Sequence, residues 1–351
     1  MNNEDRITYD SVGISTDKNK SEMGGLGEYL KTGDRNVLNG LGPFASLYDF
    51  NARAKELGMT DPLLVLKMEE PGTKQLLASQ LGLNGSIGHD VVGHIVNDIL
   101  VIGGVPVALL DCIVRGSEND KATHEIVRGF SEACRQNDMS LVGGEVSIQP
   151  GVMEKNSYVL SAALAGIVDR AKVIDGAKMK QGDHILAVAS NGLHTNGYTL
   201  ARKLMDIDPG LAQTEIAGET WLEHIMKPHT SYYPAIKDLL NNNGITGMAH
   251  ITGGGMKGNL GRIIRKDISA EIDLAKLQIL PIFREIQKRS NNTDAEMLKT
   301  FNCGVGLLVA VREEHAKTVR QHISKFHNCY TIGKIIERRN EAVLYKGKPD
   351  F

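Results

Sequence analysis

Residues 90–104, DVVGHIVNDILVIGG, run directly into residues 105–114, VPVALLDCIV. In the first segment the apolar residues recur with the 3.6-residue period of a helix, at Val92, Ile95, Val96, Ile99 and Leu100. The second segment is a nearly continuous apolar run of strand length, which is typical of a buried strand. We therefore expect a helix that packs on a sheet and leads directly into one of its strands.

Alternation of strands and helices continues on both sides of this unit. In the first half we expect strands over 62–67, 140–144 and 157–168, and a helix over 121–136. In the second half we expect strands over 185–189, 248–252, 306–311 and 341–345, with helices starting near 197 and over 231–240, 258–264 and 313–326. This pattern predicts an α/β fold, or α+β layers, in each half.

The expected organisation is a two-domain subunit with an N-terminal arm. Residues 1–60 are polar and interrupted by glycines, so we expect a loop-rich arm there. Residues 61–170 would form the first domain and residues 171–351 the second, with the boundary in the charged segment 169–181. We see no tandem repeat and no low-complexity tract.

Composition excludes several classes of protein. The 40 basic and 42 acidic residues give a net charge of −2. We therefore expect no electrostatic field that would attract nucleic acid or an anionic membrane. The start, MNNEDRITYD, lacks a signal-peptide pattern, and we expect a cytoplasmic protein without membrane contact. The four cysteines are widely spaced, which favours buried free thiols over a disulfide framework.

Glycine is in excess, with 38 residues and no collagen-like period. Turns that contain it follow predicted strands at 69–74, 141–145, 190–197 and 250–255. Such turns can expose backbone N–H groups to phosphate oxygens, although two glycines in one turn are also ordinary loop chemistry. None of the four matches a P-loop or a dinucleotide-binding fingerprint.

Carboxylates stand beside these turns, notably Glu69, Asp98 and Glu145. Mg²⁺ prefers oxygen ligands and commonly links carboxylates to substrate phosphates, so the carboxylates beside the turns and the first helix, which are Glu69, Glu70, Asp90, Asp98 and Glu145, could take part in a metal site. Asp98 lies in an apolar helix and needs a partner if it is buried, but it could also point to solvent. Asp90 could equally be a helix N-cap.

Two of the 11 histidines, His194 and His250, lie within glycine turns and are candidates for acid/base or oxyanion-stabilising roles. A turn histidine can also serve only as a cap or a local hydrogen-bond partner. His89 and His94 are five residues apart, which is not the i, i+4 spacing of a metal pair on one helix face, and on that ground we expect no zinc site there.

Several motifs together resemble the aminoimidazole ribonucleotide synthetase family, also called phosphoribosylformylglycinamidine cyclo-ligases. The resemblance runs from about residue 9 to residue 335. Its most specific parts are VNDIL (96–100), LVGGE (141–145), SNGLHTNGY (190–198), HITGGG (250–255) and FNCGVG (301–306). Related ATP-using families with the same fold would not be expected to carry FNCGVG in this context.

The resemblance implies a two-domain subunit whose N-terminal domains pair in a homodimer, with ATP bound near the interface. In the family reaction ATP phosphorylates the amide oxygen of formylglycinamidine ribonucleotide, a nitrogen attacks the activated carbon, and phosphate leaves as the imidazole ring closes.

The resemblance also implies roles for individual residues. His194, His250 and Asp98 match catalytic positions, and Glu69, Asp98 and Glu145 would hold Mg²⁺. The residues implied for nucleotide binding are Glu69, Gly72, Thr73, Lys74, Asp90, Asn97, Gly143, Gly144 and Glu145. Those implied for the phosphoribosyl substrate are Ser190, Gly192, Thr195, Asn196, Thr252, Gly253, Gly254 and Gly255.

The chain departs from the family pattern on the nucleotide side. Where the family reads S-G-T-D-G-V-G-T-K, this chain reads L-K-M-E-E-P-G-T-K over 66–74, so that Glu70 and Pro71 replace a glycine and an apolar residue. Proline removes an amide donor and glutamate adds negative charge where phosphate would approach. A family acid is also lost at Gln149, and the basic residue of the family's N-terminal arm has no clear counterpart near Gly25–Gly27.

Three functions remain open from the sequence. The first is an ATP-dependent cyclo-ligase of purine biosynthesis with a divergent nucleotide loop. The second is a paralogue that activates a different amide with ATP. The third is a non-catalytic homologue that binds a phosphorylated metabolite.

Overall fold

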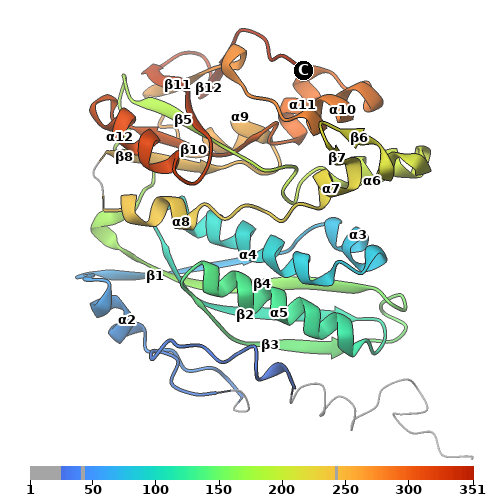
Figure 1. The fold of residues 1–351 in the computed structure, drawn as a ribbon. Helices are drawn as coiled ribbons and strands as arrows, with labels where there is room; N and C mark the ends of the chain where they lie inside the picture. Colours follow the sequence, from blue (N-terminus) through green and yellow to red (C-terminus); the bar gives the residue numbers. More distant parts are fainter. Residues whose placement is uncertain (1–24, 41–43, 242–243) are drawn as a thin grey trace, which may run out of the picture.

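The computed structural model describes residues 25–40, 44–241 and 244–351, which form two sheets with helices between and around them (Figure 1). The first sheet has four strands in the order β1-β4-β2-β3. Its strands are β1 (Pro62–Glu69), β2 (Val105–Arg115), β3 (Ser140–Ile148) and β4 (Tyr158–Asp169). Strand β4 pairs antiparallel with β1 and β2, whereas β2 and β3 are parallel. A parallel pair needs a crossover connection, and α5 (Asp120–Gln136) provides it.

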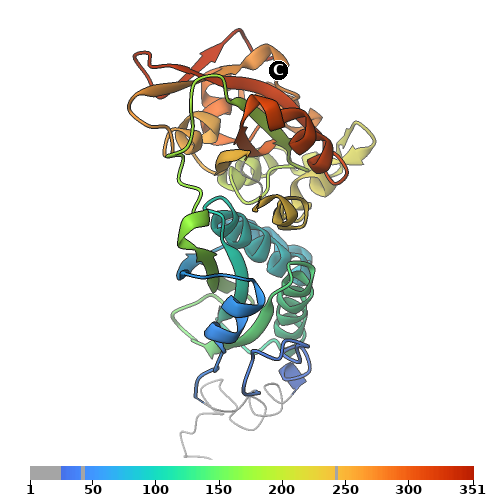
Figure 2. The same cartoon turned by 90° about the vertical axis from the view of Figure 1, so that its left-hand side faces the viewer.

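Three helices, α3 (Lys74–Leu81), α4 (Asn84–Leu100) and α5, cover one face of this sheet (Figure 2). The expected helix over 90–104 begins six residues earlier, at Asn84, and ends at Leu100, before Gly103 with its positive φ of 83°. Asp90 therefore lies inside α4, and the interpretation of Asp90 as an N-cap is wrong. Of these three helices, α5 has a side-chain cap, where Asn119 accepts the N–H of Ala122.

The described residues leave the opposite face of the first sheet largely uncovered. Leu64, Leu66 and Met68 alternate along β1 and are 56%, 72% and 64% exposed. Helix α2 (Phe50–Glu56) packs over one end of this face, where its Ala54 joins a small core with Val107 and Ile167. The expectation of a loop-rich arm over 1–60 is therefore wrong for residues 50–56, which are helical, and much of that arm lies outside the described residues.

The second sheet has six strands in the order β12-β9-β11-β5-β10-β8. They are β5 (His184–Ala189), β8 (Ile245–His250), β9 (Ile268–Asp273), β10 (Val305–Val311), β11 (Cys329–Glu337) and β12 (Val343–Lys346). Only the β12–β9 pair is parallel among these neighbours. Buried Val and Leu side chains of β5 and β10 form its centre.

Shorter elements surround the second sheet. The helices are α6 (Tyr198–Ile207), α7 (Trp221–Met226), α8 (Tyr233–Ile236), α9 (Gly255–Leu260), α10 (Pro281–Ser290), α11 (Asp294–Thr300) and α12 (Glu313–Ile323). A two-stranded ribbon is formed by β6 (Glu215–Ile216) and β7 (Glu219–Thr220). The helix expected over 231–240 is a short α-helix that continues as a 3₁₀ turn over Lys237–Leu239. Strands β9 and β11 were not expected, because their apolar residues are interrupted by charges.

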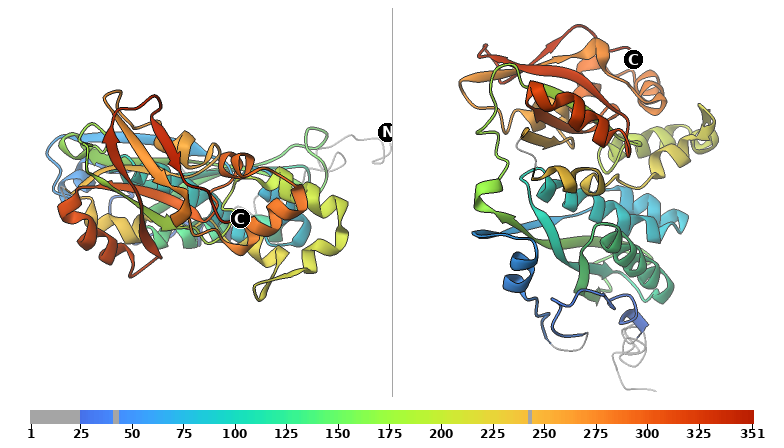
Figure 3. Two further views of the ribbon diagram at one scale, coloured as in Figure 1. Left: turned by 90° about the horizontal axis from the view of Figure 1, so that it is seen from above. Right: turned by 60° about the vertical axis from the view of Figure 1, so that its left-hand side comes forward.

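The two sheets are stacked with α4 and α8 between them (Figures 1 and 3). The segment that leads into α8, residues 227–232, lies directly on α4 through hydrogen bonds described below. Within the described ranges, none of the helices combines the length and apolar character that crossing a membrane would require.

Candidate functional site

A cavity of about 370 Å³ lies where α4 and β1 of the first half meet the end of β8 in the second half. Its polar lining comes from both halves of the chain: Lys67, Glu69, His94, Asp98, Asn196, His250, Thr252, Gly253, Asn259 and Arg262. Lys67 and Glu69 lie on the face of β1 that is turned toward α4, because residues two apart in a strand share a face. The cavity thus brings together polar residues that are up to 195 positions apart in the sequence, from Lys67 to Arg262.

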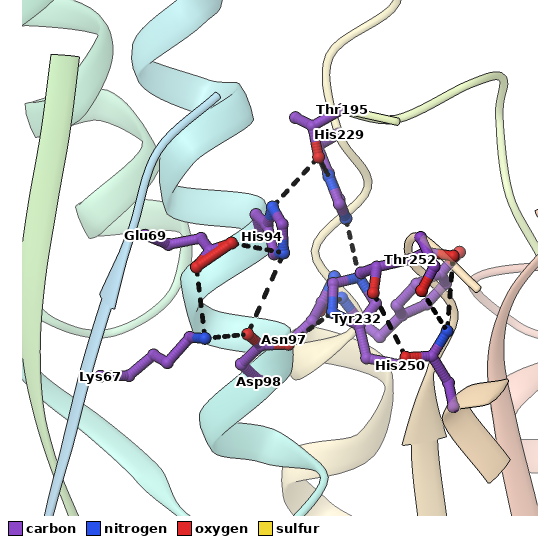
Figure 4. A network of polar contacts seen from close by, with 12 residues as sticks. Lys67, Glu69, His94, Asn97, Asp98, Thr195, His229, Tyr232, His250 and Thr252 are labelled. Carbon is purple, nitrogen blue, oxygen red and sulfur yellow. Dashed lines mark hydrogen bonds and ion pairs between the residues drawn. The ribbon is translucent and has the colours of Figure 1, made fainter. Parts of the chain in front are cut away.

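Two carboxylates in this cavity converge on one cation (Figure 4). Lys67 Nζ lies 3.2 Å from Glu69 Oε2 and 2.9 Å from Asp98 Oδ2. Asp98 Oδ1 accepts a hydrogen bond of 2.8 Å from His250 Nδ1. Although burial would raise it, the hydrogen bond and charge of His250 hold the pKa of Asp98 well below its usual 3.8. Asp98 therefore faces the site, and the alternative of an outward-pointing Asp98 is wrong.

Histidines continue this network. Thr195 Oγ1 lies 3.0 Å from His94 Nδ1 and 3.3 Å from His229 Nδ1. His229 Nε2 lies 3.0 Å from His250 Nε2, and His94 Nε2 lies 3.3 Å from Glu69 Oε1. Together the contacts close a ring through Lys67, Glu69, His94, Thr195, His229, His250 and Asp98 (Figure 4).

Sequence reasoning missed three residues of this closed network of contacts. They are Lys67, His229 and His94, which was considered only as a metal pair with His89. His94 and Asp98 are an i, i+4 pair on one face of α4, a signal that could have identified His94. Burial, together with the charge of His250, lowers the pKa of His94 to about 3. No comparable signal exists for His229, because only the tertiary fold brings its segment to α4.

The expected substrate residues divide into two groups. Thr195, Asn196, Thr252 and Gly253 lie at or beside the cavity, and Asn196 Oδ1 accepts the N–H of Gly253 at 3.1 Å. This bond ties the glycine turn after β5 to the one after β8. Gly254 and Gly255 follow at the start of α9 with positive φ angles of 95° and 63°.

Ser190 and Gly192 lie instead in the scaffold behind the cavity. Ser190 Oγ bonds Asn302 Oδ1 at 2.9 Å, and Asn302 Nδ2 donates to Gly192 O at 2.9 Å. Asn302 belongs to FNCGVG, so this motif shapes the glycine turn and does not line the cavity.

His194, a predicted catalytic residue, is 1% exposed and is stacked against His229 with 4.0 Å between ring centroids. It has a positive φ of 62°, which is uncommon for a residue other than glycine. Neither of its ring nitrogens has a hydrogen-bond partner among the described residues. Burial, followed by nearby positive charge, lowers its pKa well below 6.5.

Three residues expected at the nucleotide lie in the interior. Lys74 Nζ pairs with Asp90 Oδ1 at 2.7 Å and also donates to Lys227 O at 2.7 Å. Asp90 Oδ1 accepts the N–H of His229, while Asn97 contacts Thr230 O and the N–H of Tyr232. In this structure Lys74, Asp90 and Asn97 hold segment 227–232 on α4.

Gly143, Gly144 and Glu145 line a second cavity of about 880 Å³ on the uncovered face of the first sheet. Strands β2 and β4 separate this edge from β1, so a single chain does not bring Glu145 beside Glu69 and Asp98 as the predicted metal set requires. Lys67 lines both cavities. A residue that sequence reasoning missed, Asp111, also lines the second cavity, where burial raises its pKa to about 7.

In the divergent loop Glu69 points into the smaller cavity, whereas Glu70 is exposed and does not line it. Pro71 is buried, and Gly72, with a φ of 60°, turns the chain into Thr73 and α3. The added charge of Glu70 is therefore directed away from the Asp98 cluster.

The fold and the site define a two-sheet α/β protein with a polar cavity between its halves. Two family models match the chain: "AIR synthase related protein, N-terminal domain" over residues 59–168 and "AIR synthase related protein, C-terminal domain" over residues 180–346. The chain belongs to the AIR synthase related family.

Curated relatives carry a more specific name. A phosphoribosylformylglycinamidine cyclo-ligase of Bacillus cytotoxicus is 36% identical, over 97% of this chain and 98% of its own length. One of Streptococcus pneumoniae is 33% identical, over 90% of this chain and 92% of its own.

Solved structures share the fold at lower identity. Escherichia coli HypE is 16% identical, with a TM-score of 0.68 and 94% of each chain covered. A thiamine-monophosphate kinase of Stenotrophomonas maltophilia is 16% identical, with a TM-score of 0.65 and coverage of 95% of this chain and 96% of its own. HypE in complex with ATP has a TM-score of 0.67 at 16% identity, with 96% and 92% covered.

Proposed function

We propose that this chain is an ATP-dependent cyclo-ligase that closes formylglycinamidine ribonucleotide to aminoimidazole ribonucleotide in purine biosynthesis. The observation that carries the proposal is the 36% identity, over nearly the whole of both chains, to a relative named phosphoribosylformylglycinamidine cyclo-ligase. The cavity supports it, since His250, Asp98 and the glycine turns of 190–197 and 250–255 meet there. An ATP-using enzyme of this kind would work in the cytoplasm.

An amide is a poor electrophile until its oxygen becomes a leaving group, which explains the need for ATP. Phosphoryl transfer depends mainly on positioning and on charge stabilisation. Asp98 fixes the ring of His250 through Nδ1. In the metal-free chain Nε2 of His250, 3.0 Å from His229 Nε2, would hold or pass a proton. His194 is stacked on His229 behind the cavity and would act by positioning the ring of His229.

Asn196, Thr252 and Gly253 would hold the phosphoribosyl group of the substrate. Asn196 already fixes the backbone of Gly253, and Asn259 Nδ2 lies 3.3 Å from Gly253 O. Gly253 itself is exposed, so its backbone is open to a ligand. These contacts keep the turn rigid before substrate arrives, which lowers the ordering cost of binding.

The residues present fit a magnesium ion. The Lys67 ammonium lies within 3.2 Å of oxygens of both Glu69 and Asp98, so these carboxylates already converge on one cation. Glu69 and Asp98 would hold Mg²⁺, which would neutralise the charge of the ATP phosphates. Glu69 is one methylene longer than the aspartate usual in the family and keeps the oxygen donors.

The nucleotide site would be completed by a second subunit. Gly143, Gly144 and Glu145 lie at the uncovered face of the first sheet and line the same cavity as exposed Leu66 and Met68. Contiguous apolar surface of this kind is typical of an interaction face. Two chains paired through these faces would form a homodimer and place Glu145 at the interface, as the nucleotide role requires.

The test incubates the purified chain with formylglycinamidine ribonucleotide, ATP and Mg²⁺, and measures ADP and the aminoimidazole product by mass spectrometry. We expect both products in equal amounts. ADP formation only with another amide would identify a paralogue, and calorimetric binding of the ribonucleotide without binding of ATP would identify a metabolite-binding homologue. Either result would overturn the proposal.

A further inference from the structure

Four histidine rings form one buried cluster at the junction of the two halves. They come from α4 (His94), the turn after β5 (His194), the segment before α8 (His229) and the end of β8 (His250). The ring centroids of His194 and His229 are 4.0 Å apart, and those of His229 and His250 are 5.1 Å apart. All four rings are buried.

The orientation of two rings is that of metal ligands. The Nε2 atoms of His229 and His250 face each other at 3.0 Å. Their other nitrogens have partners on the far side of each ring: His250 Nδ1 bonds Asp98 at 2.8 Å, and His229 Nδ1 lies 3.3 Å from Thr195 Oγ1. A metal-bound histidine usually has such a carboxylate or hydroxyl at its second nitrogen, which fixes the ring and its tautomer.

His194 provides the third donor. Its ligand nitrogen lies within 4.8 Å of those of His229 and His250. It is 1% exposed, and both of its nitrogens lack a hydrogen-bond partner within the part of the chain that the structure describes. An unsatisfied buried polar group costs about 1–3 kcal/mol, and a positive φ of 62° adds backbone strain. A bound ion would satisfy this ring.

We propose that His194, His229 and His250 form a binding site for a divalent transition-metal ion of the zinc class. Imidazole suits Zn²⁺, Co²⁺ and Ni²⁺, whereas Mg²⁺ prefers oxygen, so this site is chemically distinct from the carboxylate pair Glu69 and Asp98. Three histidines leave a fourth position for water or a substrate atom. Asp98 and Thr195 are its outer partners and would orient two of the ligands.

Binding requires one hydrogen to move from Nε2 to Nδ1 of a histidine ring. In the metal-free chain the hydrogen bond between the two Nε2 atoms needs a hydrogen on one of them. Because His250 Nδ1 donates to Asp98, this hydrogen lies on His229 Nε2 in the neutral rings. The ion would take its place between the lone pairs, and the hydrogen would move to His229 Nδ1, which lies 3.3 Å from Thr195 Oγ1. Burial lowers the pKa values of His194 and His229, so these rings are otherwise in the neutral form that binds metal.

The spacing argument that excluded zinc at His89 and His94 tested only a pair on one helix. The cluster instead joins four elements, which sequence spacing does not reveal. The proposal goes beyond the cyclo-ligase reaction and is tested without substrate or ATP, so its failure would leave the proposed function untouched.

The experiment uses the full chain, stripped with a chelator and kept in millimolar Mg²⁺ to occupy oxygen sites. Titration with Co²⁺ and Zn²⁺ should give one ion per chain by elemental analysis and a tetrahedral-type visible spectrum for Co²⁺. His194→Gln and His229→Gln should lose stoichiometric binding, whereas His89→Gln, in the same helix as His94 but beside Glu132, should retain it. Asp98→Asn should weaken affinity by about 10–100-fold.

A further variant covers the case in which glutamine at these positions prevents folding. His229→Cys keeps a metal donor, and its Co²⁺ form should gain a thiolate charge-transfer band that the native chain lacks. No bound transition metal in the presence of Mg²⁺ would overturn the proposal. Unchanged binding in His194→Gln and His229→Gln, or a Co²⁺ spectrum unaltered in His229→Cys, would also overturn it.

Discussion

Lys74 and Asp90 form an ion pair of 2.7 Å in which neither side chain is exposed to solvent. The same Lys74 ammonium donates to Lys227 O, and the same Asp90 oxygen accepts the N–H of His229. The pair therefore joins α3 and α4 to the segment that carries His229. This position explains why a lysine and an aspartate occur in otherwise apolar surroundings.

Lys74→Met should destabilise the chain by about 3–5 kcal/mol, because it leaves the carboxylate of Asp90 buried without a counter-ion. The measurement is chemical denaturation followed by circular dichroism. Lys74→Met combined with Asp90→Asn should recover part of the loss, since asparagine can still accept the N–H of His229. The exposed pair of Lys237 and Asp138 offers the control: Lys237→Met should cost less than about 1 kcal/mol. Equal losses of stability at the two sites would contradict the stabilising role of the buried Lys74–Asp90 pair.

The fold could be predicted from the sequence to the extent that its elements have clear periods. The apolar run of 105–114 and the helical period of 90–104 correspond to β2 and α4, with an error mainly at the start of α4. Strand β11, CYTIGKIIE, was missed because Gly333 and Lys334 interrupt its apolar residues. It is recognised as a strand only by its pairing with β5 and β9.

The site could be predicted only in part, for a physical reason. His250 and Asp98 have local signals, a glycine turn and a charge in an apolar helix. Lys74, Asp90 and Asn97 have similar signals, but their hydrogen bonds go to segment 227–232, more than 120 positions away. A sequence shows that a buried charge needs a partner but does not show which partner it has.

Asp98→Asn should reduce ADP formation by about 100-fold or more while the fold is retained. Asparagine has a similar shape but loses the charge that orients His250 and balances Lys67. The measurement is steady-state ADP release, with circular dichroism as the check on folding. Asp61→Asn, at an exposed pair with Arg170, should leave turnover unchanged. Full activity in Asp98→Asn would place the metal and acid/base chemistry elsewhere.

Stability should fall as the pH is lowered from 7 to 5. Burial lowers the pKa of His94 to about 3 and also lowers the pKa values of His194 and His229, whereas unfolded histidines titrate near 6.5. Below pH 6.5 the unfolded chain therefore binds protons that the folded chain does not, and each histidine costs about 1.4 kcal/mol per pH unit. The folded-state pKa of Asp98 is lowered instead, so its contribution is lost only at more acidic pH.

Denaturation in chelator at pH 7 and pH 5.5 checks this prediction. His229→Gln removes one of the three groups and should make the pH dependence shallower by about 1.4 kcal/mol per unit. His89→Gln should leave the slope as it is in the native chain. A slope that is flat in the native chain would mean that these rings are protonated in the folded state.

Gly255 and Gly253 should respond differently to alanine. At Gly255 the φ is 63° and a Cβ would overlap the backbone carbonyl of Leu298, so Gly255→Ala should destabilise the chain by about 2 kcal/mol or more. At Gly253 the nearest atom to a Cβ is Asn196 Oδ1 at 3.4 Å, so Gly253→Ala should fold normally. If Gly253 contacts substrate, its variant should raise KM with little change in the melting temperature. Thermal unfolding and steady-state kinetics on both variants separate the two effects.

The uncovered face of the first sheet should control the oligomeric state. Leu66→Lys with Met68→Lys places two charges among exposed apolar residues of β1 and should convert a dimer to a monomer, as measured by light scattering. These side chains point away from the helices, so the fold of the monomer should survive. Phe326→Lys, at an exposed apolar residue of the other half, is the matched control and should leave the mass unchanged.

Because Glu145 lines the same face, loss of the dimer should also weaken ATP binding. A monomeric variant that binds ATP as well as the native chain does would show that one subunit holds the whole nucleotide site.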